Sequence, residues 1–274
     1  MMKIETHSLG ELNAYRFQGE DPKYALIISH GLGGHGGIYN IFCQHHAPKG
    51  ADIWSFDAPG HGRSNLTRPR GSWTMAEWAQ ASRDFAAHVK ELTRLPVFTL
   101  GSSMGVSAAI SAIDSPAVTG AICMGSLAVP GSQVVKMGAP YMRSEDIQKM
   151  IGRFGRGLRL DIDLFFDFDK DYGIPNAREA KLQDPLNTWS YDLASWVSLF
   201  TYEPPQALSA NTKPVLYAYG EKDELVPAPA LQMVAAEIGG EVTIKPFKDA
   251  PHQLMLFRTE EFSDAVHEFC LDNI

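Results

Sequence analysis

A chain of 274 residues is long enough to bury a full α/β core with room for an insertion. Its 45% hydrophobic and 20% charged residues are typical of a globular domain, which excludes a disordered chain or one built of membrane spans. The net charge is −8 and lysine and arginine are scattered, which argues against nucleic acid or an anionic membrane as the main partner.

The first residues lack the apolar stretch of a signal peptide, and no apolar run reaches the length of a membrane span. Three cysteines, Cys43, Cys123 and Cys270, lie far apart among apolar residues. Their odd number and surroundings predict buried free thiols. These features predict a cytoplasmic protein without stable membrane insertion, and they leave the oligomeric state open.

Strands are predicted along most of the chain. Residues 3–18 predict a hairpin of two short strands around Gly10 to Asn13. Apolar runs that are too short for helices and end in turn residues predict further strands. These runs cover residues 24–29, 52–56, 96–100, 118–124, 214–219 and 241–247.

Helical patterns lie between several of these strands. Apolar residues recur at helical spacing across 75–92, where Thr74 and Glu77 predict a capping box at the start. Further helices are predicted over 104–113, from Pro227 and Pro229 to Gly239-Gly240, and over 259–271. The alternation of strands and helices predicts an α/β fold with a mostly parallel, doubly wound sheet.

The 130–205 segment interrupts this alternation. It is rich in aromatic residues and has helical patterns without strand signals. A stretch of this length without strands predicts a helical lid inserted into the α/β unit. We therefore expect residues 1–129 and 206–274 to form the core and residues 130–205 to form the lid.

The pentapeptide Gly101-Ser102-Ser103-Met104-Gly105 fits the pattern G-x-S-x-G. It follows a predicted strand directly and opens a predicted helix, which is the placement that a nucleophile elbow requires. Larger side chains two positions either side of the serine would clash in so sharp a turn. The turn holds the hydroxyl at the carboxyl edge of the sheet, where open α/β sheets bind ligands. Ser103 is therefore the predicted nucleophile, and Ser102 lies one position off the centre of the motif.

A serine hydroxyl needs a base to become a good nucleophile. His252 follows the last predicted strand and precedes the last predicted helix, which places it at the same sheet edge as Ser103. The acid that orients this histidine is expected in the loop after strand 214–219, where we choose Asp223. The chain order serine, aspartate, histidine is the one expected for a strand–elbow–helix serine hydrolase.

Other carboxylates near these positions are weaker candidates. Glu221 and Glu224 share the loop of Asp223 and come behind it in preference. Asp249 is close to the histidine in sequence, but we expect it to bend away with the turn.

An acyl-transfer site also needs donors aimed at the oxyanion. The backbone N–H of Met104, at the start of a helix, is one candidate. The second is the N–H of Leu32, in the glycine-rich loop after strand 24–29. His30, which opens that loop, is expected to fix the loop backbone through hydrogen bonds and to take no part in the chemistry.

Five sequence blocks together resemble the α/β-hydrolase superfamily, and within it they are most similar to the monoacylglycerol lipase/lysophospholipase-like serine esterases. The blocks are His30 to His35, Asp57 to Ser64, Gly101 to Gly105, Gly220 to Asp223, and Pro251-His252. The resemblance covers nearly the whole chain apart from the lid. Within it, the block that begins at Asp57 is structural, so neither Asp57 nor His61 belongs to the triad. The sequence departs from the family pattern at Ser102, where many relatives have histidine.

The resemblance implies a serine hydrolase that cleaves carboxylic esters through an acyl-enzyme, with Ser103, Asp223 and His252 as the triad and the N–H groups of Leu32 and Met104 as the oxyanion hole. No cofactor and no metal are required. The apolar lid suggests a small-molecule ester with a medium acyl chain, an aryl group or a monoacylglycerol.

Two alternatives share the fold or the triad. A C–C bond hydrolase would use the same three side chains on vinylogous diketones. A hydrolase-fold binding protein would keep the triad without activity. A fluorophosphonate separates an enzyme from such a binding protein, because only an activated serine reacts.

Two further motifs suggest other chemistry. Residues 31–36 fit G-x-G-x-x-G after a strand, with Asp52 or Asp57 about twenty residues further on, as in a dinucleotide-dependent oxidoreductase. Residues 167–171 resemble the start of a calcium loop, but its glycine falls one position late and Arg178 stands where a glutamate is needed. We expect a solvated acidic surface there. His45-His46 has no further metal-ligating residues at a useful spacing.

Overall fold

A computed structural model describes residues 4–64, 67–138, 140–172 and 175–274. Its main sheet contains β1 (Ile4–Leu9), β2 (Leu12–Gln18), β3 (Tyr24–Ser29), β4 (Ala51–Phe56), β5 (Val97–Ser102), β6 (Val118–Met124), β9 (Val215–Gly220) and β10 (Val242–Phe247). The strand order is β1-β2-β4-β3-β5-β6-β9-β10. The strands from β4 to β10 pair in parallel, and the β1–β2 hairpin adds an antiparallel edge. Every predicted strand is present, although residue 3 lies outside the described residues.

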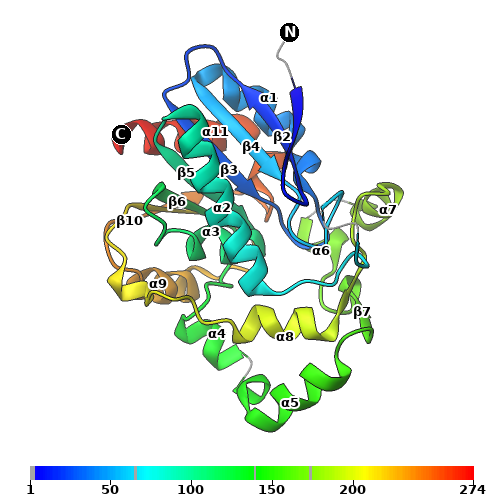
Figure 1. The fold of residues 1–274 in the computed structure, drawn as a ribbon. Helices are drawn as coiled ribbons and strands as arrows, with labels where there is room; N and C mark the ends of the chain where they lie inside the picture. Colours follow the sequence, from blue (N-terminus) through cyan, green and yellow to red (C-terminus); the bar gives the residue numbers. More distant parts are fainter. Residues whose placement is uncertain (1–3, 65–66, 139, 173–174) are drawn as a thin grey trace.

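Helices cover both faces of the sheet, as Figure 1 shows. One face carries α2 (Met75–Thr93), α3 (Gly105–Ser111) and α9 (Ala228–Glu237), and the other carries α1 (Asn40–His46), α10 (Leu254–Phe257) and α11 (Thr259–Asp272). β3 shows why two layers form. Its residues Ala25 and Ile27 pack in one buried cluster, whereas Leu26 and Ile28 pack in the other, because alternate side chains of a strand point to opposite faces. The predicted doubly wound α/β fold is confirmed.

The predicted helix boundaries agree best with the structure where capping residues lie at the end of the helix. Thr74 accepts a hydrogen bond from the N–H of Glu77, and the Glu77 carboxylate accepts from the N–H of Thr74, so the predicted capping box at the start of α2 is formed. The helix predicted over 104–113 is shorter, as α3. The short helices α1 and α10 were not predicted, because one or two turns give too little periodicity to detect.

The 130–205 segment is mainly helical, as predicted, with α4 (Gln133–Gly138), α5 (Glu145–Phe154), α6 (Phe168–Tyr172), α7 (Ala177–Gln183) and α8 (Leu193–Thr201). It also contains a two-stranded antiparallel sheet of β7 (Arg159–Asp161) and β8 (Ser190–Asp192). The sequence missed these strands because three residues are too few to show alternation. In Figure 1, α4, α5 and α8 lie together at the bottom of the view, far from the N-terminus. The division into a core and a lid stays a prediction.

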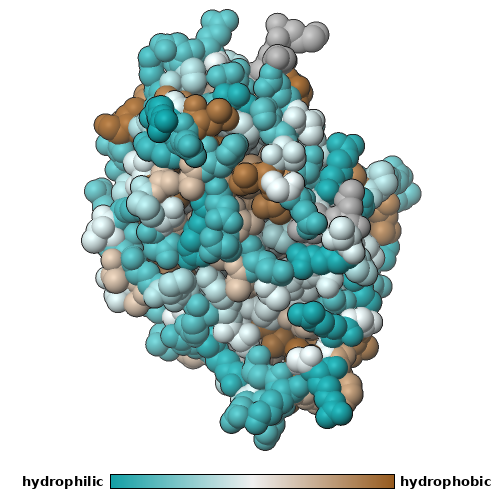
Figure 2. Space-filling view, viewed as in Figure 1, coloured by the Kyte–Doolittle hydropathy of each residue, from teal (hydrophilic) through white to brown (hydrophobic). Residues whose placement is uncertain are grey.

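The surface in Figure 2 is hydrophilic over most of the visible face, with separate apolar patches and a hollow between α5 and α8. Cys43, Cys123 and Cys270 are buried and free, as predicted. Burial raises the pKa of the Cys123 thiol to about 12. Within the part of the chain that the structure describes, no helix is both long enough and apolar enough to cross a membrane.

Candidate active site

Ser103 lies in the sharp turn between β5 and α3, as the motif predicts. Its φ is +52°, in the left-handed region that costs energy for a residue with a side chain. A Cβ added to Gly101 would lie 2.4 Å from the Cα of Val106, and one added to Gly105 would lie 2.2 Å from the carbonyl oxygen of Ser29. Only glycine fits at both positions, so the packing of the turn accounts for both glycines of the motif.

The imidazole of His252 lies between the other two predicted triad residues. Its Nε2 is 3.0 Å from Oγ of Ser103, and its Nδ1 is 2.7 Å from Oδ2 of Asp223. Since a carboxylate only accepts, Nδ1 carries the proton and Nε2 is free to accept the serine O–H. The other oxygen of Asp223 accepts the N–H of Leu225 at 3.0 Å. His252 and Asp223 are buried, whereas Ser103 is partly exposed and can meet a substrate.

The remaining carboxylates lie away from the imidazole. Glu221 is exposed to solvent. Glu224 and Asp249 each form an ion pair with a surface lysine, at 2.8 Å and 3.0 Å. The structure therefore brings the preferred acid, Asp223, to His252 and leaves the alternatives at the surface.

The loop after β3 lies against the nucleophile. A Cβ added to Gly31 would come within 3.3 Å of the Ser103 Cβ. The N–H groups of Leu32, in this loop, and of Met104, next to the serine, make no hydrogen bond within the described ranges. Unpaired N–H groups on two segments beside the serine hydroxyl are what an oxyanion hole requires.

His30 fixes the backbone around this loop, as expected. Its Nδ1–H donates to the carbonyl of Gly31 at 2.9 Å, and its Nε2 accepts the N–H of Ala58 at 3.1 Å. Complete burial, reinforced by the neighbouring His61, holds the pKa of His30 well below its usual value. His30 is therefore a neutral structural side chain.

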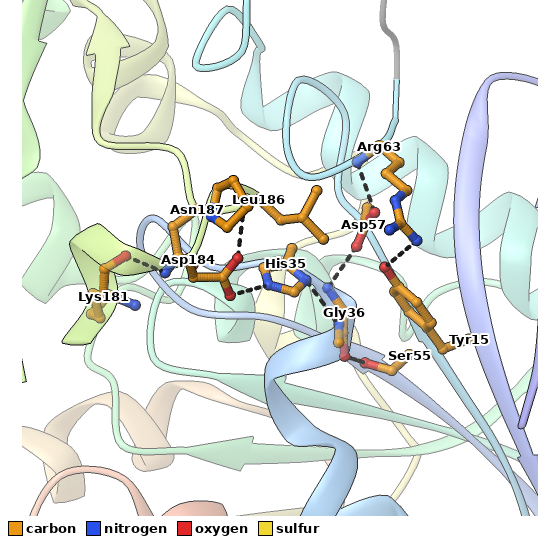
Figure 3. Close-up of polar contacts among 12 residues, drawn as sticks. Tyr15, His35, Gly36, Ser55, Asp57, Arg63, Lys181, Asp184, Leu186 and Asn187 are labelled. Carbon is orange, nitrogen blue, oxygen red and sulfur yellow. Dashed lines mark hydrogen bonds and ion pairs between the residues drawn. The ribbon is translucent and has the colours of Figure 1, made fainter.

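Asp57 is also structural. Its carboxylate accepts the side-chain amide of Asn13 at 3.0 Å and the N–H groups of Gly36 and Arg63 at 2.7 Å and 2.8 Å. Figure 3 shows this carboxylate between the glycine-rich loop and the turn that contains Arg63. The three donors compensate a buried charge and hold the two loops together.

Residues of the 130–205 segment hold the glycine-rich loop from the other side, and no sequence pattern predicted this role for them. The N–H of Gly33 donates to the hydroxyl of Tyr191 at 2.8 Å, and its carbonyl accepts the N–H of Thr188 at 2.9 Å. In Figure 3, the carboxylate of Asp184 faces His35, with Oδ2 to Nε2 at 2.8 Å. No short motif marks these three residues, because they meet the loop only once the chain has folded.

The unusual Ser102 joins three loops of the site. The hydroxyl of Tyr39 accepts the N–H of Gly31 at 3.2 Å and has a polar interaction with the Ser102 side chain. Oγ of Ser102 in turn donates to Oε1 of Gln253 at 3.2 Å. Gln253 follows His252 directly, so this buried chain of polar contacts links the glycine-rich loop, the elbow and the histidine loop.

Aromatic rings of the 130–205 segment surround the imidazole. The ring centroids of Phe166 and Tyr172 lie 5.9 Å and 6.5 Å from that of His252. Tyr172 is nearly parallel to the imidazole, with 29° between the planes. These rings limit the access of water to the histidine.

The fold and this arrangement define an α/β-hydrolase. The sequence model of the family described as serine aminopeptidase, S33, matches residues 20–258, and the chain belongs to that family. The match includes the glycine-rich loop at 31–36, which favours the hydrolase interpretation over a dinucleotide-binding one.

Individual relatives agree with this assignment. The chain is 23% identical over 263 residues to a monoacylglycerol lipase of Mycolicibacterium smegmatis, covering 93% of this chain and 87% of that protein. It superposes on the crystal structure of Paleococcus ferrophilus monoacylglycerol lipase with a TM-score of 0.74 at 23% identity, covering 96% and 100% of the two chains. A thermostable carboxyl esterase from Bacillus coagulans gives a TM-score of 0.76 at 15% identity, covering 99% and 98%. The predicted resemblance to monoacylglycerol lipase-like α/β-hydrolases is confirmed, and it supports ester hydrolysis as the general class of reaction.

The calcium-like stretch is accounted for by local contacts. Asp167 accepts the N–H of Lys170 at 3.1 Å, and Asp169 accepts the N–H of Arg178 at 2.9 Å. The glycine of this pattern, Gly173, lies outside the described residues. Elsewhere in the described ranges, no group of three or more His, Cys, Asp or Glu is placed to hold a metal ion.

Proposed function

We propose that the chain hydrolyses carboxylic esters through an acyl-enzyme formed on Ser103, with His252 as general base and Asp223 as the residue that orients it. The observation that carries this proposal is the hydrogen-bonded chain from the Asp223 carboxylate through the imidazole to the Ser103 hydroxyl. A serine activated in this way attacks carbonyl carbon, and the tautomer that Asp223 stabilises is the one that can accept the serine proton.

The first half of the reaction forms the acyl-enzyme. Nε2 of His252 takes the proton as Oγ of Ser103 bonds to the ester carbonyl carbon, and the π electrons of the carbonyl move to its oxygen. The N–H groups of Leu32 and Met104 donate to this oxyanion. The carbonyl then re-forms, the bond to the alcohol oxygen breaks, and the alcohol leaves with the proton from His252.

The second half repeats these steps with water. His252 takes a proton from water as its oxygen attacks the acyl carbonyl, and the new oxyanion is held by the same two N–H groups. The bond to Ser103 then breaks, His252 returns the proton to the serine oxygen, and the acid is released. This chemistry needs no cofactor and no metal.

The relatives named as monoacylglycerol lipases and as a carboxyl esterase support a small ester substrate. Phe166 and Tyr172, beside His252, offer aromatic surface to an acyl or aryl group. We therefore propose esters with a medium acyl chain, an aryl group or a glycerol leaving group.

A substrate panel tests this proposal. It contains p-nitrophenyl esters of increasing chain length, monoacylglycerols and vinylogous diketones. We expect turnover of the first two classes, and its loss in Ser103→Ala. Faster cleavage of the diketones would favour a C–C bond hydrolase. No turnover together with no fluorophosphonate labelling would favour a binding protein.

A further inference from the structure

A cavity of about 370 Å³ lies beside the proposed active site, between the 130–205 segment and the core. Its walls are mainly apolar and include Ile38, Tyr172, Leu256 and Phe257. One cation, Lys181 of α7, also lines it. The cavity is open to solvent on one side, and Lys181 is half-buried, with its alkyl chain against apolar neighbours.

The cavity is one side chain away from the proposed catalytic groups. The ring of Tyr172, one of its walls, stacks on the imidazole of His252 with 6.5 Å between centroids. Ile38, another wall, lies against the glycine-rich loop, since a Cβ added to Gly34 would be 2.8 Å from the Cδ1 of Ile38. The cavity therefore borders two segments, α6 and the glycine-rich loop, that also contact the proposed catalytic groups.

Two aromatic rings lie next to the ammonium group of Lys181. Its Nζ lies 5.1 Å from the centroid of the Phe168 ring and 5.9 Å from that of Tyr172. Among the described residues, Nζ of Lys181 forms no ion pair and no hydrogen bond, and the Asp184 carboxylate acts on it only as a nearby charge. Burial lowers the pKa of Lys181 to about 8, so the side chain is still mainly protonated at pH 7.

The carboxylate of Asp184 also borders the cavity but is engaged elsewhere. Its Oδ2 accepts from His35 at 2.8 Å, and its Oδ1 accepts the N–H of Leu186 at 2.9 Å. Figure 3 shows this carboxylate turned toward His35. Asp184 thus screens part of the charge of Lys181 from a distance and leaves the N–H donors of the ammonium unused.

We propose that this cavity is a subsite for a carboxylate-bearing arm of the ester substrate, held by the ammonium group of Lys181. A single-charged carboxylate on an alkyl chain fits both the apolar walls and the lone cation. A phosphate, which carries more charge and more bound water, would find too few donors here. The inference rests on the proposed ester hydrolysis and specifies its substrate class.

Two matched substrate pairs test the subsite. On the acyl side, mono-p-nitrophenyl adipate is compared with p-nitrophenyl hexanoate, in which a methyl group replaces the terminal carboxylate. On the alcohol side, 4-butanoyloxybutanoate is compared with butyl butanoate. In at least one pair we expect kcat/KM of the wild type to be higher for the charged ester. Lys181→Met should lower that charged-to-neutral ratio at least about ten-fold, as expected for the loss of a charged hydrogen bond.

Two variants make the result specific. Lys181→Arg keeps the charge and should retain the preference. Lys170→Met removes an exposed lysine of the neighbouring α6, which pairs with Glu224 at 2.8 Å, and should leave the ratio unchanged. A ratio in Lys181→Met within about two-fold of the wild type would overturn the subsite, as would a wild type that prefers both neutral esters. A wild type that cleaves none of the four esters would instead overturn the proposed function.

Discussion

The hydroxyl of Tyr191 joins the 130–205 segment to the proposed oxyanion loop, because it accepts the N–H of Gly33 and lies 2.8 Å from Nε2 of His61. Nδ1 of His61 faces the carbonyl of Pro59 at 3.0 Å and therefore carries the ring proton, so Nε2 accepts the tyrosine O–H. Burial lowers the pKa of His61 to about 4, which keeps it an acceptor at neutral pH. Tyr191 thus positions the loop that carries Leu32.

Tyr191→Phe should lower kcat for a p-nitrophenyl ester about ten-fold and leave KM within about two-fold, because the loop would hold the oxyanion donor less firmly while ground-state contacts persist. The affinity for a trifluoromethyl ketone, which forms an oxyanion on the serine, should fall in parallel. Tyr24→Phe is the matched control, since Tyr24 is equally buried and bonded to two histidines far from the site. Equal kcat in the two variants would contradict a positioning role.

Ser103→Ala should lower p-nitrophenyl ester turnover at least ~1000-fold, because it removes the proposed nucleophile. Ser102→Ala should retain most of the turnover, since its hydroxyl points to Tyr39 and Gln253 and not to His252. It should cost about 1 kcal/mol of unfolding free energy through lost hydrogen bonds. Steady-state kinetics measure the turnover of each variant, and urea denaturation measures the unfolding free energy of Ser102→Ala. Equal loss of activity in the two variants would show that the elbow is misassigned.

Asp223→Asn should lower kcat about 10³- to 10⁴-fold, because an amide can donate to Nδ1 and thereby favour the wrong imidazole tautomer. Glu224→Gln, one residue further along the same loop, is the control, since its carboxylate is exposed and pairs with Lys170. Pre-steady-state kinetics should show that the variant slows acylation. A variant with wild-type kcat would exclude Asp223 as the orienting acid.

The stability of the fold should depend on His46, which is buried far from the site against Tyr24 and Ser263. Burial, with a smaller effect of His267, lowers its pKa to about 3, so the folded state binds fewer protons than the unfolded state below about pH 6.5. Above pH 6.5 the neutral His46 ring makes its full contribution to the free energy of unfolding. This contribution is lost as the pH falls toward 3. From pH 7 to pH 5 the loss amounts to about 2 kcal/mol from this residue.

Urea unfolding of His46→Gln measures this contribution. The variant should be less stable than the wild type at pH 7. The difference in unfolding free energy between the two proteins should be smaller by about 2 kcal/mol at pH 5. His45→Gln, an exposed position on the same helix, should follow the wild type. A gap that stays constant with pH would show that His46 does not titrate in this way.

Sequence patterns predict those parts of the fold that are determined by the residues of one short segment. A buried strand shows as an apolar run, the capping box of α2 as Thr74 and Glu77, and the elbow as Gly101 and Gly105, whose added Cβ atoms would clash. Chain order along a parallel sheet then predicts that residues after β5, β9 and β10 meet at one edge.

The remaining features depend on contacts between distant segments. Tyr191 lies 158 positions from the Gly33 that it bonds, and Ser102 lies 151 positions from Gln253. β7 and β8 are stabilised by pairing with each other and by packing in the 130–205 segment, and no local pattern encodes either. These contacts shape the loops around the proposed triad, which is why sequence patterns place Ser103, Asp223 and His252 but do not indicate the residues that hold those loops.

Labelling with a fluorophosphonate, followed by mass spectrometry of the peptides, tests most directly whether the hydroxyl of Ser103 is activated by His252. We expect one adduct on the peptide that contains Ser103, full labelling of Ser102→Ala, none of Ser103→Ala, and labelling slowed at least about 100-fold in His252→Ala. An adduct on another residue, or a wild type that stays unlabelled, would contradict the activation of Ser103 by His252.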